Sequence, residues 1–210
     1  MDSQIIIALT KGRPLKQALE LLSKVKIEPI DDIESSRKLV FETNHPTTRL
    51  MVLRGADVAT YVEHGIADLG FAGRDVLLEH GEEGYYQPLD LGIGRCDMMV
   101  AGLADEGVLP KRLKIATKFV KIAQRYYSAK GVQVDIIKLY GAMELAPVMG
   151  LAHRIVDIVE TGNTLKANGL VSLEHIVDIS TRLIVNKSAM KMKHERVQYL
   201  IDELGLAVSA

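Results

Sequence analysis

The sequence predicts an α/β protein with a largely parallel sheet. Short apolar runs rich in β-branched residues alternate with helical patterns along most of the 210 residues. Hydrophobic residues make up 48% of the chain, a fraction typical of a folded protein and not of a disordered one. The length accommodates one large domain or two domains of about 100 residues each.

In the first half of the chain, strands are expected at residues 4–9, 38–43, 48–53 and 66–72, and helices at 14–23, 56–64 and 74–80. Pro14 suits the first turn of a helix, while Gly65 and Gly81 suit helix ends. Asn44-His45-Pro46 has the composition of a turn between the second and third strands.

In the second half, strands are expected at residues 95–103, 114–118, 133–140 and 155–159, and helices at 120–129 and 143–149. Segments 170–179 and 181–185 lead to a final amphipathic helix at 188–204. Gly92 and Gly94 mark one crossing between lobes, and a second is expected near 177–181. We therefore expect one lobe of residues 1–91 with 180–210, a second lobe of 92–179, and a ligand cleft between them.

Composition excludes several classes of protein. The net charge is −1, so no general attraction to nucleic acid or to an anionic membrane is expected. Cys96 is the only cysteine, which excludes an intrachain disulfide and disfavours a cysteine zinc cluster. The N-terminus has no basic region before its short apolar run, and no run is long enough to span a bilayer. A soluble cytoplasmic protein is expected.

Residues 156–170 (VDIVETGNTLKANGL) carry the most chemical information. An apolar strand with two acids, Asp157 and Glu160, runs into the sequence Thr-Gly-Asn-Thr at 161–164. Small hydroxylated residues and a glycine after a strand let backbone N–H groups converge on an anion. The carboxylates would then meet ribose hydroxyls or a metal ion. The segment outlines a phosphoribosyl site.

Three positions apart on a strand, Asp157 and Glu160 would point to opposite faces of the sheet. Both can serve one ligand only if the strand ends near Val159 and the chain turns there, as the following Thr-Gly favours. The alternative is that both acids are ordinary solvated residues at a strand end.

Basic residues follow the first strand, at the place where an α/β sheet presents its ligands. Gly12 would allow close approach to the backbone, and Lys11 and Arg13 would add positive charge at a helix start. The alternative is an ordinary turn with solvated bases. Arg37, at the start of the next predicted strand, is by itself a surface arginine with either role open.

Residues 65–75 are rich in glycine. Asp68 leads a predicted strand, Gly70 and Gly73 would keep its far end open, and Arg74 would start the next helix, with its N–H groups directed at a ligand. The alternative is that the glycines only permit close packing of strand on helix. The G-x-G-x-x-G spacing is absent, so a dinucleotide site is not indicated.

Cysteine and histidine chemistry is not indicated. Cys96 has no histidine partner in the pattern, so it is expected to be a small buried residue and not a nucleophile. The six histidines show no paired ligand spacing with an acid between them, which disfavours a zinc hydrolase. His153 and His175 are therefore expected to be structural or exposed.

Four segments distributed over the chain form a recognisable set: residues 8–13 (ALTKGR), 68–73 (DLGFAG), 144–147 (ELAP) and 157–165 (DIVETGNTL). Together they resemble the short form of the ATP phosphoribosyltransferase family, which opens histidine biosynthesis. The last segment resembles the family's phosphoribosyl-pyrophosphate loop. The family often has proline where Thr10 stands here, but the adjacent Lys-Gly-Arg is intact.

The resemblance implies two lobes like those of periplasmic binding proteins, with the active site in the interlobe cleft. The implied reaction joins N1 of ATP to C1 of 5-phosphoribosyl 1-pyrophosphate, releasing pyrophosphate and giving phosphoribosyl-ATP. Mg²⁺ is the expected cofactor, held mainly by substrate phosphates. No nucleophilic side chain is needed, because the protein's task is orientation and electrostatic stabilisation.

The resemblance also implies roles for individual residues. Those expected to face the pyrophosphate or the ATP phosphates are Lys11, Arg13 and Arg37. Those expected to bind phosphoribosyl pyrophosphate are Asp157, Glu160, Thr161, Gly162, Asn163 and Thr164. Those expected to line the nucleotide pocket are Leu9, Gly12, Asp68, Gly73, Arg74, Arg95 and Cys96.

Short-form members assemble with a regulatory subunit that resembles histidyl-tRNA synthetase, so the chain's end at Ala210 implies such a partner. A hetero-octamer, and a homodimer of the catalytic chain, are expected. Two other functions stay open from the residues alone. One is a solute-binding module with the same fold and no chemistry, and the other is a phosphoribosyltransferase that acts on a free base.

Overall fold

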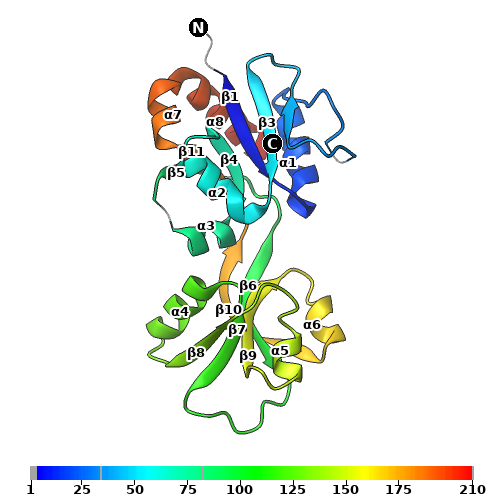
Figure 1. The fold of residues 1–210 in the computed structure, drawn as a ribbon, viewed down its shortest axis with the longest axis vertical. Coiled ribbons are helices and arrows are strands. Elements are labelled where there is room, and N and C mark those ends of the chain that lie inside the picture. The colour runs from blue at the N-terminus through cyan, green and yellow to red at the C-terminus, as the bar shows by residue number, and fades with distance from the viewer. Residues whose placement is uncertain (1–3, 34, 82, 210) are drawn as a thin grey trace. The chain divides into compact units, whose positions relative to one another are not determined.

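Figure 1 shows a computed structural model of the chain, which describes residues 4–33, 35–81 and 83–209. These residues form two compact units. Unit 1 holds the residues up to Gly94 together with those from Ser180, and unit 2 is Arg95–Ile179. The first passage between the units follows Gly94, whereas the sequence-based division placed it after residue 91.

Unit 1 contains a six-stranded sheet with the order β2-β3-β1-β4-β11-β5. Its strands are β1 (Ile5–Thr10), β2 (Val40–Glu42), β3 (Thr48–Leu53), β4 (Leu69–Gly73), β5 (Tyr85–Asp90) and β11 (Thr181–Asn186). β1 is parallel to β3 and to β4, while the other three neighbouring pairs are antiparallel. The turn at Asn44-His45-Pro46 joins β2 to β3, as the sequence predicted.

Helices cover both faces of this sheet, because its central strands are apolar on both sides. α1 (Arg13–Lys24) and α8 (His194–Ser209) pack on one face, where Leu22 and Leu204 are fully buried. α2 (Gly55–Glu63) and α3 (Arg74–His80) cover the other face with Val58, Val62 and Leu77. Removing each such side chain from water stabilises the fold by roughly 1.5–3 kcal/mol.

The single final helix predicted at 188–204 is wrong, because the structure has α7 (Lys187–Met192) and α8 separated at Lys193. The Asn186 side chain caps α7 by accepting hydrogen bonds from the N–H groups of Ser188 and Ala189. At Lys193 the backbone leaves the helical region, with φ −121°. The apolar spacing continues across the break, so the pattern alone did not reveal it.

The Lys193 side chain explains the break. Its Nζ lies 2.7 Å from Asp68 Oδ1 and 2.9 Å from Oδ2, and it also donates to the Gln4 carbonyl at 2.6 Å. Asp68 is 6% exposed, and its Oδ2 accepts the Ile6 N–H at 2.9 Å. This ion pair, in which Asp68 is buried and Lys193 half-buried, therefore holds the amino ends of β1 and β4 against the junction of α7 and α8.

Strand β5 was missed by the sequence reading. It contains Pro88, which cannot donate to a ladder, and most of its residues are exposed. Proline is confined to edge strands, and β5 does lie at the edge of the sheet.

Unit 2 contains a five-stranded sheet with the order β10-β6-β9-β7-β8. Its strands are β6 (Cys96–Leu103), β7 (Leu113–Thr117), β8 (Val134–Lys138), β9 (Arg154–Val159) and β10 (Leu170–Ile179). β7 is parallel to β8 and β9, while β6 is antiparallel to β9 and β10. The expectation of largely parallel sheets is thus wrong for both units, because antiparallel strands flank each parallel trio.

Helices α5 (Leu145–Val148) and α6 (Asn163–Ala167) pack on one face of this sheet, where Ala146 and Leu165 join the buried cluster. α4 (Val120–Ala129) packs on β7 and β8 (Figure 1). Beside it, Glu174 of β10 accepts hydrogen bonds from Tyr126 and Lys130 and pairs with Arg154. The bond from Lys130 is the largest cause that lowers the pKa of the Glu174 carboxyl.

None of the helices in the described residues has the length and hydropathy that a bilayer crossing requires.

We predict that Lys193→Met destabilises the protein by about 3 kcal/mol, because it leaves the buried Asp68 carboxylate without its cation. Urea unfolding followed by circular dichroism measures the loss. Lys191→Met removes an exposed lysine from the last turn of α7, two residues before Lys193, and is the control, with an expected change within about 0.5 kcal/mol. Equal stability of the two variants would show that the ion pair does not hold this end of the unit.

Candidate functional site

In unit 1, the parallel strands β1, β3 and β4 bring three loop ends to one edge of the sheet. Thr10 pairs with Leu53, and Leu9 pairs with Phe71, so the three strands end at the same level. α1, α2 and α3 begin at this edge, and their N-caps are Gly12, Arg54 and Gly73. No side chain caps these helices at the three N-cap positions, but backbone bonds satisfy part of each first turn. The N–H groups of Leu15, Asp57 and Arg74 donate to the carbonyls of Gly12, Arg54 and Ser180.

The segment Lys11-Gly12-Arg13 is exposed at this edge. The Lys11 N–H donates to the Leu53 carbonyl at 2.7 Å, which holds the segment against the end of β3. Gly12 has φ +107°, which other residues rarely adopt, and a Cβ built there would meet no described atom within 4 Å. The backbone here is open to a ligand, and α1 starts directly after it.

Two further arginines lie toward this edge. Arg37 stands in the loop before β2, and because β2 is antiparallel to β3 this loop reaches the carboxyl end of β3, where the Val52 N–H donates to the Leu39 carbonyl. Arg54 directly follows β3 and is exposed. The sequence reasoning missed Arg54, although it follows the predicted strand 48–53 just as Lys11 follows the first strand.

Two residues predicted to line the nucleotide pocket, Asp68 and Leu9, do not present side chains at this edge, and Gly70, expected to keep the strand end open for a ligand, has another role. Asp68 precedes β4 and so lies at the opposite edge, paired with Lys193. The Leu9 side chain is fully buried in the core. A Cβ on Gly70 would lie 2.7 Å from Val62 and 2.9 Å from Val58, so this glycine serves the close packing of α2, which was the alternative interpretation.

Gly73 and Arg74 do lie at the edge, at the junction of β4 and α3. The Arg74 N–H donates to the Ser180 carbonyl at 2.9 Å, and a Cβ on Gly73 would collide with the Asp75 carboxylate at 2.3 Å. The glycine therefore allows Asp75 to fold back over the start of α3.

In unit 2, the two acids Asp157 and Glu160 and the Thr161–Thr164 turn lie at the carboxyl end of β9. The strand ends at Val159, as their joint use of one ligand requires, and Gly162 adopts the left-handed conformation with φ +72° and ψ 3°. The Thr161 hydroxyl accepts the Asn163 N–H at 3.4 Å, and Thr161, Asn163 and Thr164 are exposed. The turn thus presents hydroxyl, amide and backbone groups together.

The two acids differ in their surroundings. Asp157 is half-buried and is the cross-strand neighbour of Met99, while Glu160 is exposed after the strand end. Lys118 Nζ lies 4.0 Å from Asp157 Oδ1, at the carboxyl end of the parallel strand β7. The sequence reasoning missed Lys118, although it follows a predicted strand at the edge where ligands are expected.

A pocket of about 330 Å³ opens beside the turn. Its lining residues come from β6, from the end of β9 through α6, and from β10: Asp97, Met99, Val159, Glu160, Thr161, Gly162, Leu165, Lys166, Leu170, Val171 and Ser172. Its volume lies at the lower end of the range for small-molecule sites. Lys166 places a positive charge on the wall of this pocket, and the sequence analysis did not predict it.

Arg95 and Cys96 stand at the start of β6. Cys96 is half-buried, and its cross-strand neighbour is Ile179. The expectation of a small buried residue is therefore wrong. β6 is antiparallel to β9, so these two residues share the edge that carries the Thr161–Thr164 turn.

Comparison with known proteins gives one family over most of the chain. The family model described as "HisG: ATP phosphoribosyltransferase" matches residues 54–205. A relative from Saccharophagus degradans, named ATP phosphoribosyltransferase, is 58% identical over 207 residues, covering 99% of this chain and 97% of the relative. One of the same name from Hahella chejuensis is 60% identical over 212 residues, with both chains covered completely.

Solved structures extend the comparison. A chain of the ATP phosphoribosyl transferase (HisG:HisZ) complex from Thermotoga maritima superposes with a TM-score of 0.85 at 36% identity, over 98% of this chain and 99% of that one. The aliphatic sulphonate binding protein SsuA from Escherichia coli superposes with a TM-score of 0.62 at 12% identity, over 99% of this chain and 73% of that one. The second likeness shows the two-lobe periplasmic binding protein fold alone.

Proposed function

The chain belongs to the ATP phosphoribosyltransferase family, and from that premise we propose which of its residues carry the reaction. It is a pentosyltransferase that catalyses the first step of histidine biosynthesis. N1 of ATP is joined to C1 of 5-phosphoribosyl 1-pyrophosphate, and the products are phosphoribosyl-ATP and pyrophosphate.

The turn at the end of β9 binds the 5-phosphate of phosphoribosyl pyrophosphate. The observation that carries this assignment is the left-handed Gly162, which follows the end of β9 and lines the pocket together with Thr161. Asn163 and Thr164 are the next residues of the same turn and are exposed. Hydroxyl and N–H groups in such a turn donate to phosphate oxygens. Lys166 adds a positive charge on the pocket wall.

Asp157 and Glu160 accept hydrogen bonds from the ribose hydroxyls. Both acids are also suitable ligands for Mg²⁺, which prefers carboxylate and phosphate oxygens, and one of them is exposed at the strand end. When bound, Mg²⁺ would neutralise charge on the departing pyrophosphate. Lys118 fixes the orientation of Asp157 from the neighbouring strand.

The edge of unit 1 binds phosphate groups of ATP or of the pyrophosphate. Lys11, Arg13 and Arg37 supply positive charge, and Gly12, Gly73 and Arg74 supply open backbone and a helix start. Arg54 joins this group because it stands at the same level of the sheet. Arginine suits the task, since it pairs with phosphate through two parallel hydrogen bonds and stays charged.

Arg95 and Cys96 remain proposed nucleotide contacts from unit 2. Leu9 would contribute only through its backbone, and Asp68 only by holding the end of β4, because their side chains are buried.

The chemical step needs no covalent intermediate. The attacking adenine nitrogen is neutral and the leaving group is a polyanion, so positive charge develops at C1 while negative charge collects on pyrophosphate. Fixed carboxylates near the ribose and fixed cations near the phosphates stabilise both ends of this separation. The positioning of the two substrates supplies the remainder of the rate enhancement.

A second subunit completes the enzyme in the cell. The similar Thermotoga maritima chain comes from a HisG:HisZ complex, and this chain matches it over nearly its whole length. We propose that a HisZ-like regulatory subunit binds here too, in a hetero-octamer that contains homodimers of the catalytic chain. A biosynthetic role that consumes ATP places the assembly in the cytoplasm.

The purified protein, mixed with ATP, phosphoribosyl pyrophosphate and Mg²⁺, is predicted to form phosphoribosyl-ATP, which is followed by near-ultraviolet absorbance and chromatography. The same protein with free adenine in place of ATP is predicted to give no adduct. An adenine adduct would instead identify a transferase that acts on free bases. If neither mixture gives product even with the HisZ-like subunit added, the fold serves binding alone.

Gly162→Ala is predicted to weaken phosphoribosyl pyrophosphate binding at least ten-fold, because alanine at φ +72° costs about 1–2 kcal/mol and opens the turn. Gly169→Ala is the matched control, since Gly169 has φ +74° at the other end of α6 and no described atom within 4 Å of its Cβ. Calorimetric titration measures both. Equal weakening in the two variants would mean that the phosphate lies elsewhere, and Thr161→Ala with Thr164→Ala checks this without backbone strain.

Arg13→Ala and Arg37→Ala are predicted to lower kcat by about 10²-fold each, with a smaller effect on ATP affinity, if these residues stabilise the leaving group. Lys16→Ala removes one exposed positive charge from the next turn of α1 and should keep the wild-type rate. Steady-state kinetics separates kcat from KM. A wild-type kcat in either arginine variant would remove that arginine from the mechanism.

A further inference from the structure

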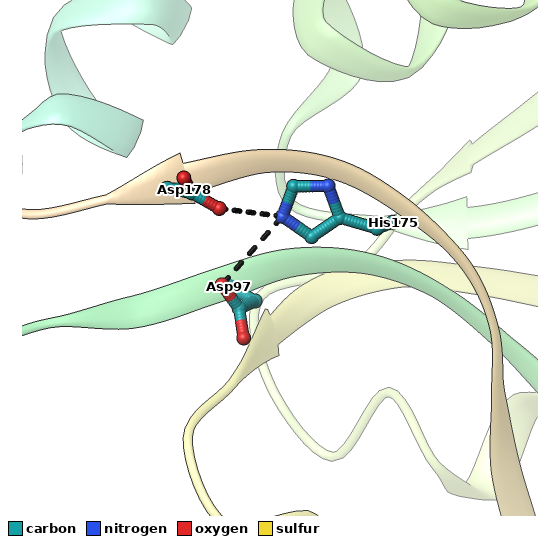
Figure 2. Close-up of side chains that lie close together, drawn as sticks. All are labelled: Asp97, His175 and Asp178. Atoms are coloured by element: carbon teal, nitrogen blue, oxygen red, sulfur yellow. Dashed lines mark ion pairs between the residues drawn. The ribbon is translucent and has the colours of Figure 1, made fainter.

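Asp97, His175 and Asp178 converge at the edge of unit 2 that carries the Thr161–Thr164 turn. His175 Nε2 lies 2.8 Å from Asp178 Oδ1 and 3.6 Å from Asp97 Oδ1. One ligand atom from each residue lies within 4.8 Å of the other two. Figure 2 shows one imidazole nitrogen of His175 joined by dashed lines to both carboxylates, with Asp178 and His175 on β10 and Asp97 on β6.

An irregularity in β10 brings the three side chains together. Residues three apart on a regular strand point to opposite faces. The register between β6 and β10 shifts between His175 and Val177, so that His175 pairs with Met99 while Asp178 pairs with Asp97. The bulge turns His175 and Asp178 toward the same side, which is how bulges re-aim side chains next to functional sites.

The resulting donor set is one imidazole nitrogen and two carboxylate oxygens. An imidazole nitrogen binds first-row transition metal ions in preference to Mg²⁺. Because the protein supplies only three ligand atoms, the remaining coordination positions are open to water or to a bound small molecule. We propose that Asp97, His175 and Asp178 form a binding site for a divalent transition metal ion, of the Mn²⁺, Co²⁺ or Zn²⁺ class. Its three residues differ from the carboxylates Asp157 and Glu160 assigned above, although Asp97 and Glu160 line the same pocket.

Asp97 also lines the pocket beside the Thr161–Thr164 turn, so the metal site borders a pocket that can hold a ligand. A metal ion held there would face the pocket that contains Thr161 and Lys166, so its open positions could accept oxygen atoms of an anion bound in that pocket. Half-exposed His175 and Asp97 leave the ion accessible from solvent. The metal site rests on its own three residues and does not depend on the assigned substrate.

Co²⁺ binding to the full chain, in the absence of any substrate, tests the proposal by calorimetry and visible absorbance. The wild type is expected to bind one Co²⁺ ion. His175→Gln and Asp178→Asn are each expected to weaken that binding by about ten-fold or more, because each removes a direct ligand. Asp178 is 85% exposed, so its replacement leaves the fold intact.

His80→Gln is the matched control, since His80 Nε2 lies 2.7 Å from the carboxylate oxygen Glu63 Oε2, in unit 1. It should bind Co²⁺ as the wild type does. Failure of the wild type to bind, or unchanged affinity in both His175→Gln and Asp178→Asn, would overturn the metal site. Phosphoribosyl pyrophosphate affinity, measured separately on the same variants without added transition metal, distinguishes that outcome from a failure of the assigned function.

Discussion

The parallel alignment of two strand trios is the constraint on which the functional arrangement depends. β1 lies between β3 and β4 in unit 1, and β7 lies between β8 and β9 in unit 2. Parallel neighbours end at the same edge of a sheet, so loops far apart in the sequence present their residues together. Lys11, Arg54 and Gly73 meet in this way in unit 1, as do Lys118 and Asp157 in unit 2.

The contacts that stabilise unit 1 and the ligand site proposed for it lie at opposite ends of the sheet. At the amino end, the ion pair between Asp68 and Lys193 joins the strands to the C-terminal helices, and Asn186 donates to carbonyls of α2 and caps α7. The carboxyl end keeps exposed cations and a glycine in an unusual conformation. Exposed cations contribute little to folding, and their clustering is accounted for by the polyphosphate substrates of the family.

Local patterns in the sequence predicted most of the fold and the turn that follows Val159, because strand ends, glycines and hydroxyls act over a few residues. Three features depend on contacts distant in the sequence and were not predictable in this way. The break at Lys193 is set by Asp68, the packing role of Gly70 is set by α2, and the grouping of Asp97 with His175 depends on a bulge in β10. Asp68 is a different case. Its place before the strand already put it at the far edge, and only the family resemblance suggested a nucleotide contact.

The central claim is that the turn from Thr161 to Thr164 receives the phosphate of phosphoribosyl pyrophosphate. Titration of the ¹⁵N-labelled chain with that substrate, followed by amide chemical shifts, tests it most directly. The account predicts that the largest early changes fall on the amides of Gly162, Asn163 and Thr164. Changes that spare these amides and appear only at Lys11–Arg13 would contradict it.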